Sequence, residues 1–187
     1  SAHGRGEHRL EGDLHHVPEG VLALVGGGLL AGDDVVGDRA DGQGPRLVLG
    51  GNVLGWNLNG DEAFRVLDRF VAGGGTMIDT ADIYSKWAPG NKGGESESLI
   101  GDWLRRRGRR DDVQIATKVG MDEGLSAATI ERGIEASLKR LGTDHVDLYF
   151  SHKDDPDTPL EETLSAFDRL VKAGKTLAIG ASQIESE

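Results

Sequence analysis

Short runs with strand character alternate with amphipathic helical stretches from residue 46 onward, and this alternation restricts the possible folds most. The strand-like runs are RLVLGGN (46–52), TMIDTA (76–81), DVQIATKVG (112–120), HVDLYFSH (145–152) and TLAIGASQ (176–183). The helical stretches between them cover residues 61–74, 97–108, 126–142 and 158–174. When each strand is followed by a helix, consecutive strands are joined by right-handed crossovers and form a parallel sheet. The sequence therefore predicts an α/β fold.

Two of the helical stretches carry residues that are typical of helix ends. Ser126 is predicted to cap the third helix, whose apolar residues follow at intervals of three and four. In the fourth helix, Thr158 is the predicted N-cap, Pro159 the first helical residue and Glu161 the partner in a capping box. Gly174 is predicted to end that helix.

The predicted strands end at Gly50, Asp79, Lys118, His152 and Ser182, at intervals of 29, 39, 34 and 30 residues. Each interval has about the length of one βα unit. The carboxyl ends of parallel strands lie at one edge of the sheet, so these side chains are expected to converge there. In a (β/α)8 barrel, this edge carries the active site. A complete barrel has about 250 residues, and the sequence supplies about its first five strands and four helices.

The residue types at these strand ends suit proton transfer to a carbonyl oxygen. Tyr84 follows Asp79 by five residues, on the predicted turn after the strand. A phenol has an ordinary pKa near 10, and a Lys118 ammonium beside it is expected to lower the pKa of Tyr84. Asp79 is expected to hold that ammonium in place, and His152 to orient a substrate oxygen. A proton donor of this kind works together with a source of hydride.

Several segments together are similar to the signature segments of the aldo-keto reductase family. They are IDTADIY, IATKVG, DLYFSH and GKTLAIGASQ, in that order, and GGESESLIG resembles the family's G-x-S-E segment. The resemblance covers residues 46–187. It implies a (β/α)8 TIM barrel, incomplete in this chain, that binds NADPH and passes its hydride to an aldehyde or ketone. The resemblance does not decide between NADPH and NADH.

The resemblance also implies roles for single residues. Tyr84 becomes the general acid, Lys118 and Asp79 lower its pKa, and His152 orients the substrate carbonyl. The residues implied at the cofactor are Gly51, Asn52, Asp79, Ser182 and Gln183. The residues implied at the substrate are Trp56, Trp87 and His152. The family usually has Asn at the position of Gln183, whose amide offers the same donor and acceptor on a stem one methylene longer.

Two other classes of function fit the same residues. The chain can be a non-catalytic cofactor-binding or regulatory barrel, or an inactive fragment. It can also belong to a lyase or isomerase that forms a Schiff base at Lys118. A complete set of Asp79, Tyr84, Lys118 and His152 favours catalysis over the first alternative. The sequence leaves the carbonyl substrate and the oligomeric state open.

The composition disfavours several partners. A net charge of −11 argues against nucleic acid and anionic membranes. The run RRRGRR at 105–110 lies at the end of a predicted helix, directly before two aspartates, and is read as a solvated helix end. The chain has no cysteine, which suits a reducing cytoplasm.

The resemblance to the aldo-keto reductases implies a small carbonyl compound as substrate. We expect no metal site.

Residues 1–45 differ in composition from the rest. Up to residue 46 the chain holds 11 of its 29 glycines, four of its six histidines and no lysine. The segment shows no sustained strand or helix period, so we expect a disordered or non-native extension, for example from a start site assigned too far upstream. GGGLLA at 26–31 has the G-x-G-x-x-A pattern of a dinucleotide-binding turn. Because no good helix sequence follows it, we interpret it as a linker.

Overall fold

A computed structural model describes residues 21–25, 28–29 and 48–183 of the chain. Its strands are β1 (Val21–Val25), β2 (Gly28–Leu29), β3 (Val48–Gly50), β4 (Met77–Asp79), β5 (Gln114–Val119), β6 (Val146–Ser151) and β7 (Thr176–Ala181). Its helices are α1 (Gly60–Ala72), α2 (Glu95–Arg107), α3 (Ala127–Leu141) and α4 (Leu160–Lys172), with a short 3-10 helix, η1 (Gly51–Val53). The five strands and four helices predicted from residue 46 onward are confirmed.

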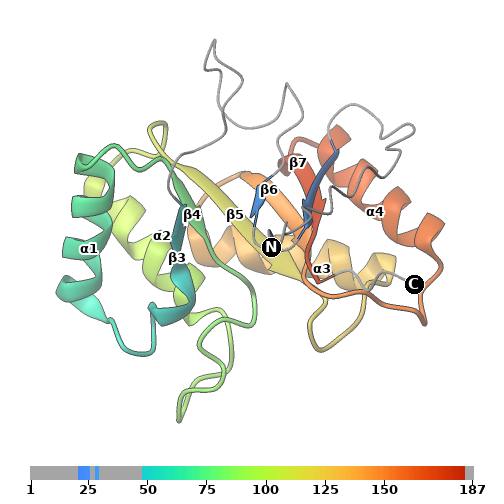
Figure 1. Ribbon diagram of the computed structural model, residues 1–187, viewed down its shortest axis with the longest axis horizontal. Helices are drawn as coiled ribbons and strands as arrows, with labels where there is room; N and C mark the ends of the chain where they lie inside the picture. Colours follow the sequence, from blue (N-terminus) through green and yellow to red (C-terminus); the bar gives the residue numbers. More distant parts are fainter. Residues whose placement is uncertain (1–20, 26–27, 30–47, 184–187) are drawn as a thin grey trace, which may run out of the picture.

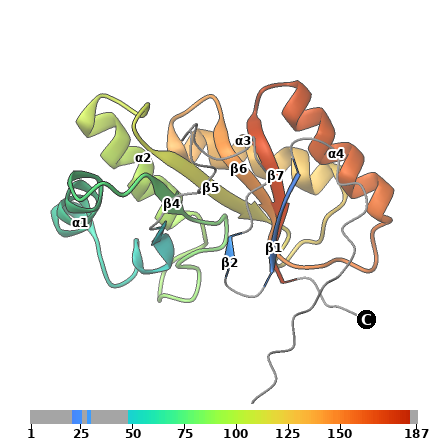
Figure 2. The same ribbon diagram turned by 45° about the horizontal axis from the view of Figure 1, so that its top comes forward.

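The strands form one sheet in the order β2-β1-β7-β6-β5-β4-β3. From β3 to β7, neighbours in the sheet are consecutive in the chain and run parallel. The helices follow one another in chain order along one side of the sheet (Figures 1 and 2). All polar strand ends from β4 to β7 therefore lie at the same edge, as the sequence predicted.

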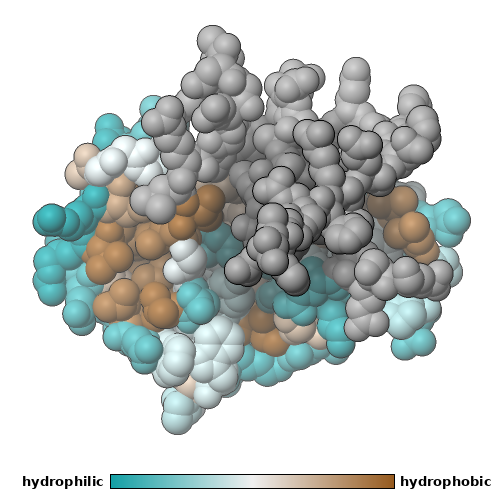
Figure 3. Space-filling model, in the orientation of Figure 1, coloured by the Kyte–Doolittle hydropathy of each residue, from teal (hydrophilic) through white to brown (hydrophobic). Residues whose placement is uncertain are grey.

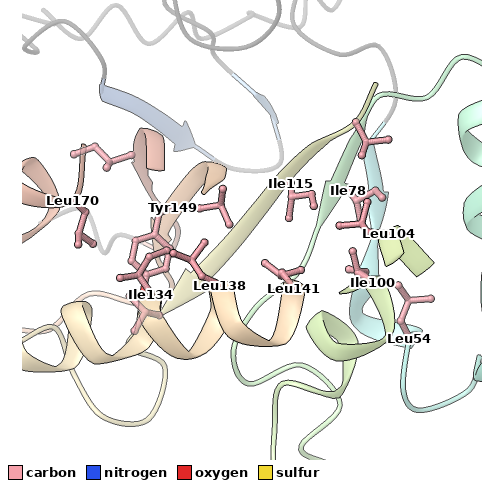
Figure 4. Packing of buried hydrophobic residues seen from close by; sticks show 14 of the residues in the cluster. Leu54, Ile78, Ile100, Leu104, Ile115, Ile134, Leu138, Leu141, Tyr149 and Leu170 are labelled. Carbon is pink, nitrogen blue, oxygen red and sulfur yellow. The ribbon is translucent and has the colours of Figure 1, made fainter. Parts of the chain in front are cut away.

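Successive side chains of a strand point to opposite faces of the sheet, and the buried residues accordingly form two hydrophobic clusters. Residues that face the helices, such as Ile78, Ile115 and Tyr149, belong to the larger cluster. Figure 4 shows Ile134 and Leu138 pointing from α3 toward this side of the sheet. The residues next to them in sequence face the opposite side. They form the smaller cluster of Met77, Ala116, Leu148, Phe150 and Ala178, which we call the inner cluster.

The two central helices approach each other closely at a glycine. A Cβ atom on Gly101 of α2 would lie only 2.2 Å from the backbone oxygen of Arg140 in α3. Real Cβ atoms do not approach a carbonyl oxygen so closely, so the crossing of α2 and α3 requires glycine at this position. The crossing fixes the middle of α2 against the C-terminal end of α3.

The predicted helix ends are confirmed in part. Ser126 caps α3, because its side chain accepts a hydrogen bond from the backbone of Thr129. The capping box of α4 is wrong: the helix begins at Leu160, no side chain caps it, and the Thr158 hydroxyl donates to Asp155 instead. The helix-end interpretation of 105–110 is supported, since each arginine of this run pairs with a carboxylate.

The two N-terminal strands lie at one edge of the sheet. β1 pairs in parallel with β7, and β2 pairs antiparallel with β1. The sequence analysis did not predict these pairings; the rest of residues 1–45, including most of the GGGLLA segment, lies outside the described residues. At the other edge, β3 has no second neighbour in the part of the chain that the structure describes. Figure 3 shows hydrophobic surface beside α1 and β3.

Candidate active site

Strand alternation places the ionisable strand-end residues on one side of the sheet. Asp79 follows the inner-cluster residue Met77 by two positions, and Lys118 follows Ala116 by two. His152 stands in the same relation to Phe150. Because side chains two residues apart in a strand share a face, all three face away from the helices. This confirms their predicted convergence from the backbone register alone.

Lys118 joins Asp79 and Tyr84 into one hydrogen-bonded group. The Nζ of Lys118 lies 2.6 and 2.7 Å from the two carboxylate oxygens of Asp79 and 2.9 Å from the Oη of Tyr84. The Tyr84 hydroxyl donates to Asp79 at 3.2 Å. A fourth hydrogen bond runs from Nζ to the backbone oxygen of Thr80 at 2.9 Å. The ammonium is thus held in one position by acceptors on two sides.

The turn that carries Tyr84 is anchored at the next residue. Ser85 has a φ of 70°, a conformation uncommon for residues other than glycine. Its buried hydroxyl donates to the backbone oxygen of Leu54 at 2.6 Å, and its own backbone oxygen accepts from Asn91 at 2.9 Å. These contacts hold the turn open so that the Tyr84 ring reaches back toward Lys118.

The pKa of Tyr84 moves in the direction opposite to the prediction. Burial raises the pKa well above its ordinary value of 10.0, and the Asp79 charge and hydrogen bond raise it further. Lys118 does lie within reach of Oη, but its charge is largely balanced by the Asp79 carboxylate. Burial lowers the pKa of Lys118 itself, while Asp79 acts against that shift. The phenol therefore keeps its proton at neutral pH.

His152 is buried, and its ring packs against Tyr84 with 5.8 Å between the ring centroids. Burial and the positive charge of Lys118 lower the pKa of His152 from 6.5 to about 4. Its imidazole is therefore neutral at pH 7 and carries one N–H donor. The buried Nδ1 has no hydrogen-bond partner among the residues that the structure describes. This leaves hydrogen-bonding capacity for a bound molecule.

Two tryptophans lie beside the tyrosine. Trp56 and Trp87 meet edge to face with ring centroids 5.8 Å apart, and Trp87 lies 6.2 Å from the Tyr84 ring. Both are half exposed, at 45% and 50%. The structure thus brings together two residues predicted to line a substrate pocket, although that role stays a prediction.

Four of the predicted cofactor residues follow the carboxyl ends of β3 and β7, the first and last strands of the consecutive parallel series. Gly51 begins η1 directly after β3, and a Cβ atom there would lie 2.7 Å from the backbone oxygen of Asp79. Asn52 follows it with an exposed side chain. At β7, the Ser182 backbone amide donates to Ser151, and Gln183 is exposed with a φ of 51°. Their cofactor contacts stay predictions.

Four polar side chains on the helix side of these strands were not predicted from the sequence. Thr80, Ser96, Glu97 and Thr117 are all fully buried and hydrogen-bonded to one another in pairs. The resemblance of GGESESLIG to a family segment pointed to this region but assigned no role to it. Asp82 was also missed, and it lines a cavity of about 300 Å³ between α3 and the loops after β4 and β5.

The described residues contain no group of three or more His, Asp or Glu side chains arranged to hold a metal ion. No helix in the described ranges is long and apolar enough to cross a membrane.

Comparison with known proteins shows the family of the chain. Residues 46–187 match the Aldo/keto reductase family. Aldo-keto reductase str7 of Strobilurus tenacellus is 40% identical over 130 residues, which cover 68% of this chain and 36% of that protein. Uncharacterized oxidoreductase YrpG of Bacillus subtilis is 41% identical over 149 residues, covering 73% and 45%. Norsolorinic acid reductase stcV of Emericella nidulans is 37% identical over 135 residues, covering 65% and 33%. The chain spans between a third and a half of the length of these curated relatives.

Proposed function

Because the chain belongs to the aldo/keto reductase family, we propose that it carries the proton-donating part of a site that reduces an aldehyde or ketone with NADPH. The observation that supports this most is the single ammonium of Lys118 bonded to both Asp79 and Tyr84. The fold is accordingly the first part of a TIM barrel, with the site at the carboxyl ends of its strands.

Tyr84 is the proposed general acid. Its hydroxyl hydrogen, which is donated to Asp79, turns to the carbonyl oxygen of the substrate. Lys118 continues to donate to Oη, and this hydrogen bond strengthens as the oxygen becomes negative. The raised pKa of Tyr84 keeps the acid in its protonated form until the substrate oxygen gains charge. Asp79 holds the ammonium in place throughout.

His152 is the proposed orienting group for the carbonyl. A pKa of about 4 leaves the imidazole uncharged at neutral pH, so it donates one hydrogen bond without competing as an acid. Trp56 and Trp87 are proposed to line the substrate pocket on the far side of the tyrosine.

The cofactor is proposed to lie between β3 and β7, along the carboxyl edge of the sheet. NADPH, when bound, supplies the hydride. The residues present fit its nicotinamide end, because the hydroxyl of Ser182 and the amide of Gln183 can pair with a carboxamide. Gly51 and Asn52 are proposed beside the ribose. A reducing cytoplasm is the proposed location.

A matched pair of variants tests the proposal. The chain has two tyrosines, and Tyr149 is buried on the helix side, where its hydroxyl reaches the backbone of Ile130 at 3.3 Å. In the protein as its natural source produces it, Tyr84→Phe is expected to abolish NADPH oxidation with an aromatic aldehyde. Tyr149→Phe is expected to retain it. Equal activity in both variants would remove Tyr84 as the acid.

A Schiff-base enzyme is disfavoured by the surroundings of Lys118. Nζ already donates to two carboxylate oxygens, a backbone oxygen and a phenol, and the Asp79 charge favours its protonated form, which has no lone pair to attack a carbonyl carbon. Borohydride trapping of a carbonyl compound on Lys118 would support the alternative and contradict hydride transfer.

A further inference from the structure

The N-terminal end of α2 contacts the backs of the strands that carry the site. Thr80 directly follows Asp79, and Thr117 directly precedes Lys118. Because neighbouring side chains point to opposite faces, both threonines face the helices. The Thr80 hydroxyl donates to the Ser96 hydroxyl at 2.8 Å. The Thr117 hydroxyl donates to Glu97 at 2.5 Å. Neighbouring residues of α2 therefore contact the immediate neighbours of two site residues.

Ser96 joins two strand ends directly through its hydroxyl group, and a third through Thr80. It accepts from Thr80 and donates to the backbone oxygen of Gly51 at 2.8 Å. Thr80 in turn offers its backbone oxygen to Lys118. Ser96 and Thr80 are each 0% exposed, so water cannot replace a lost partner easily.

The anchor of this connection is rigid. Glu97, the next residue, is also 0% exposed and pairs with the Nε of Arg140 in α3 at 2.6 Å. The close crossing of α2 and α3 at Gly101 holds the middle of the same helix, five residues after Ser96. A displacement of the Ser96 hydroxyl would therefore have to be absorbed by the strand ends and not by the helix.

We propose that Ser96 is a positioning residue, which fixes the Lys118 ammonium through Thr80 and fixes the Gly51 backbone through a second hydrogen bond. It touches none of the reacting groups itself. The effect of Ser96 on catalysis rests on the proposed reductase function. Its effect on the position of the Lys118 ammonium is independent of that function.

The geometry predicts different effects for two single substitutions. Thr80→Val removes the link to Lys118 and leaves the bond between Ser96 and Gly51. It is expected to lower kcat about five- to tenfold without changing the Kd for NADPH. Ser96→Ala removes both links, so kcat falls similarly and the Kd for NADPH rises. Thr80→Ser keeps the hydroxyl and is expected to restore kcat.

A buried threonine at the opposite edge of the sheet supplies the control. Thr176 begins β7, is 1% exposed and donates its hydroxyl hydrogen to the backbone oxygen of Ala178 at 2.6 Å, so Thr176→Val removes a comparable hydrogen bond away from the carboxyl ends of the strands. If it lowers kcat as much as Ser96→Ala, the effect is general destabilisation and the proposal fails. The proposal also fails if Thr80→Val and Ser96→Ala shift kcat and Kd in the same proportion.

An NMR readout separates this proposal from the reductase proposal. The charge of Lys118 depresses the pKa of His152, so the titration of His152 reports the placement of that ammonium without any substrate. The variant Lys118→Met removes the charge and so gives the full rise expected in the His152 pKa. Ser96→Ala and Thr80→Val are expected to change the His152 pKa by part of that amount, and Thr176→Val to leave it unchanged. An unchanged value in both Ser96→Ala and Thr80→Val contradicts the positioning role, whether or not the protein reduces carbonyls.

Discussion

Asp82 carries a buried charge whose cost can be measured. Its Oδ1 is buried and accepts no hydrogen bond from the residues that the structure describes. Burial and the charge of Glu97 raise its pKa from 3.8 to about 7, against the opposing charge of Arg140. The folded chain therefore holds a proton on Asp82 that the unfolded chain releases near pH 4. The free energy of unfolding contains a contribution that falls as the pH rises from 3.8 toward 7.

The size of this contribution follows from the shift. A pKa shift of about three units corresponds to about 4 kcal/mol of lost stability above pH 7. We expect Asp82→Asn to recover about half of that stability. Urea unfolding at pH 8 should show a variant about 2 kcal/mol more stable than the wild type, and the difference should fall to less than half of this at pH 5 and vanish below about pH 4. Asp122→Asn is the control, since that carboxylate lines the same cavity but has a side chain 47% exposed.

Two results would refute this reasoning. A variant that is no more stable than the wild type at pH 8 would mean that the carboxylate has a partner or water that stabilises its charge. A gain that is the same at pH 5 and pH 8 would mean that titration of Asp82 is not its cause.

Two further predictions concern the strand ends. Gly51→Ala should lower the free energy of unfolding in urea by about 2 kcal/mol, as overpacking does, because its Cβ would lie 2.7 Å from the backbone oxygen of Asp79. The control Gly50→Ala should be neutral, because the nearest atom to its Cβ would be 3.7 Å away. Equal costs for the two variants would exclude the close contact as the reason. Hydrogen bonds from Thr158 and the backbone hold the pKa of Asp155 below 3.8, so its stabilising effect is present above that pH and is lost as the pH falls through the lowered pKa. Asp155→Asn should therefore reduce stability at pH 7 and approach the wild type in acid; a pH-independent loss would contradict this.

The sequence predicted the parts of the site that depend on strand register. Asp79, Lys118 and His152 end consecutive strands at the spacing of βα units, and a parallel sheet allows only one relative placement of such residues. The position of Tyr84 followed from its distance to Asp79 along the turn. These predictions needed no knowledge of side-chain packing.

The parts that the sequence did not predict depend on packing between distant segments. The bond from Thr80 to Ser96 joins a strand end to a helix, and nothing in either local sequence marks the partner. The direction of the Tyr84 pKa shift was wrong because it depends on burial and on which group Asp79 neutralises. The capping box at Thr158 failed because Asp155 offered its hydroxyl a competing acceptor.

The transfer of label from cofactor to substrate tests the central claim most directly. The natural protein that contains this chain would be given NADPH deuterated at the hydride position, together with a panel of aldehydes and ketones, and the product alcohols would be examined by mass spectrometry. We predict deuterium on the carbinol carbon with the wild type and with Tyr149→Phe, and none with Tyr84→Phe. An unlabelled alcohol, no alcohol from any member of the panel, or equal labelling with Tyr84→Phe would contradict the assignment of Asp79, Tyr84, Lys118 and His152 as a carbonyl-reducing site.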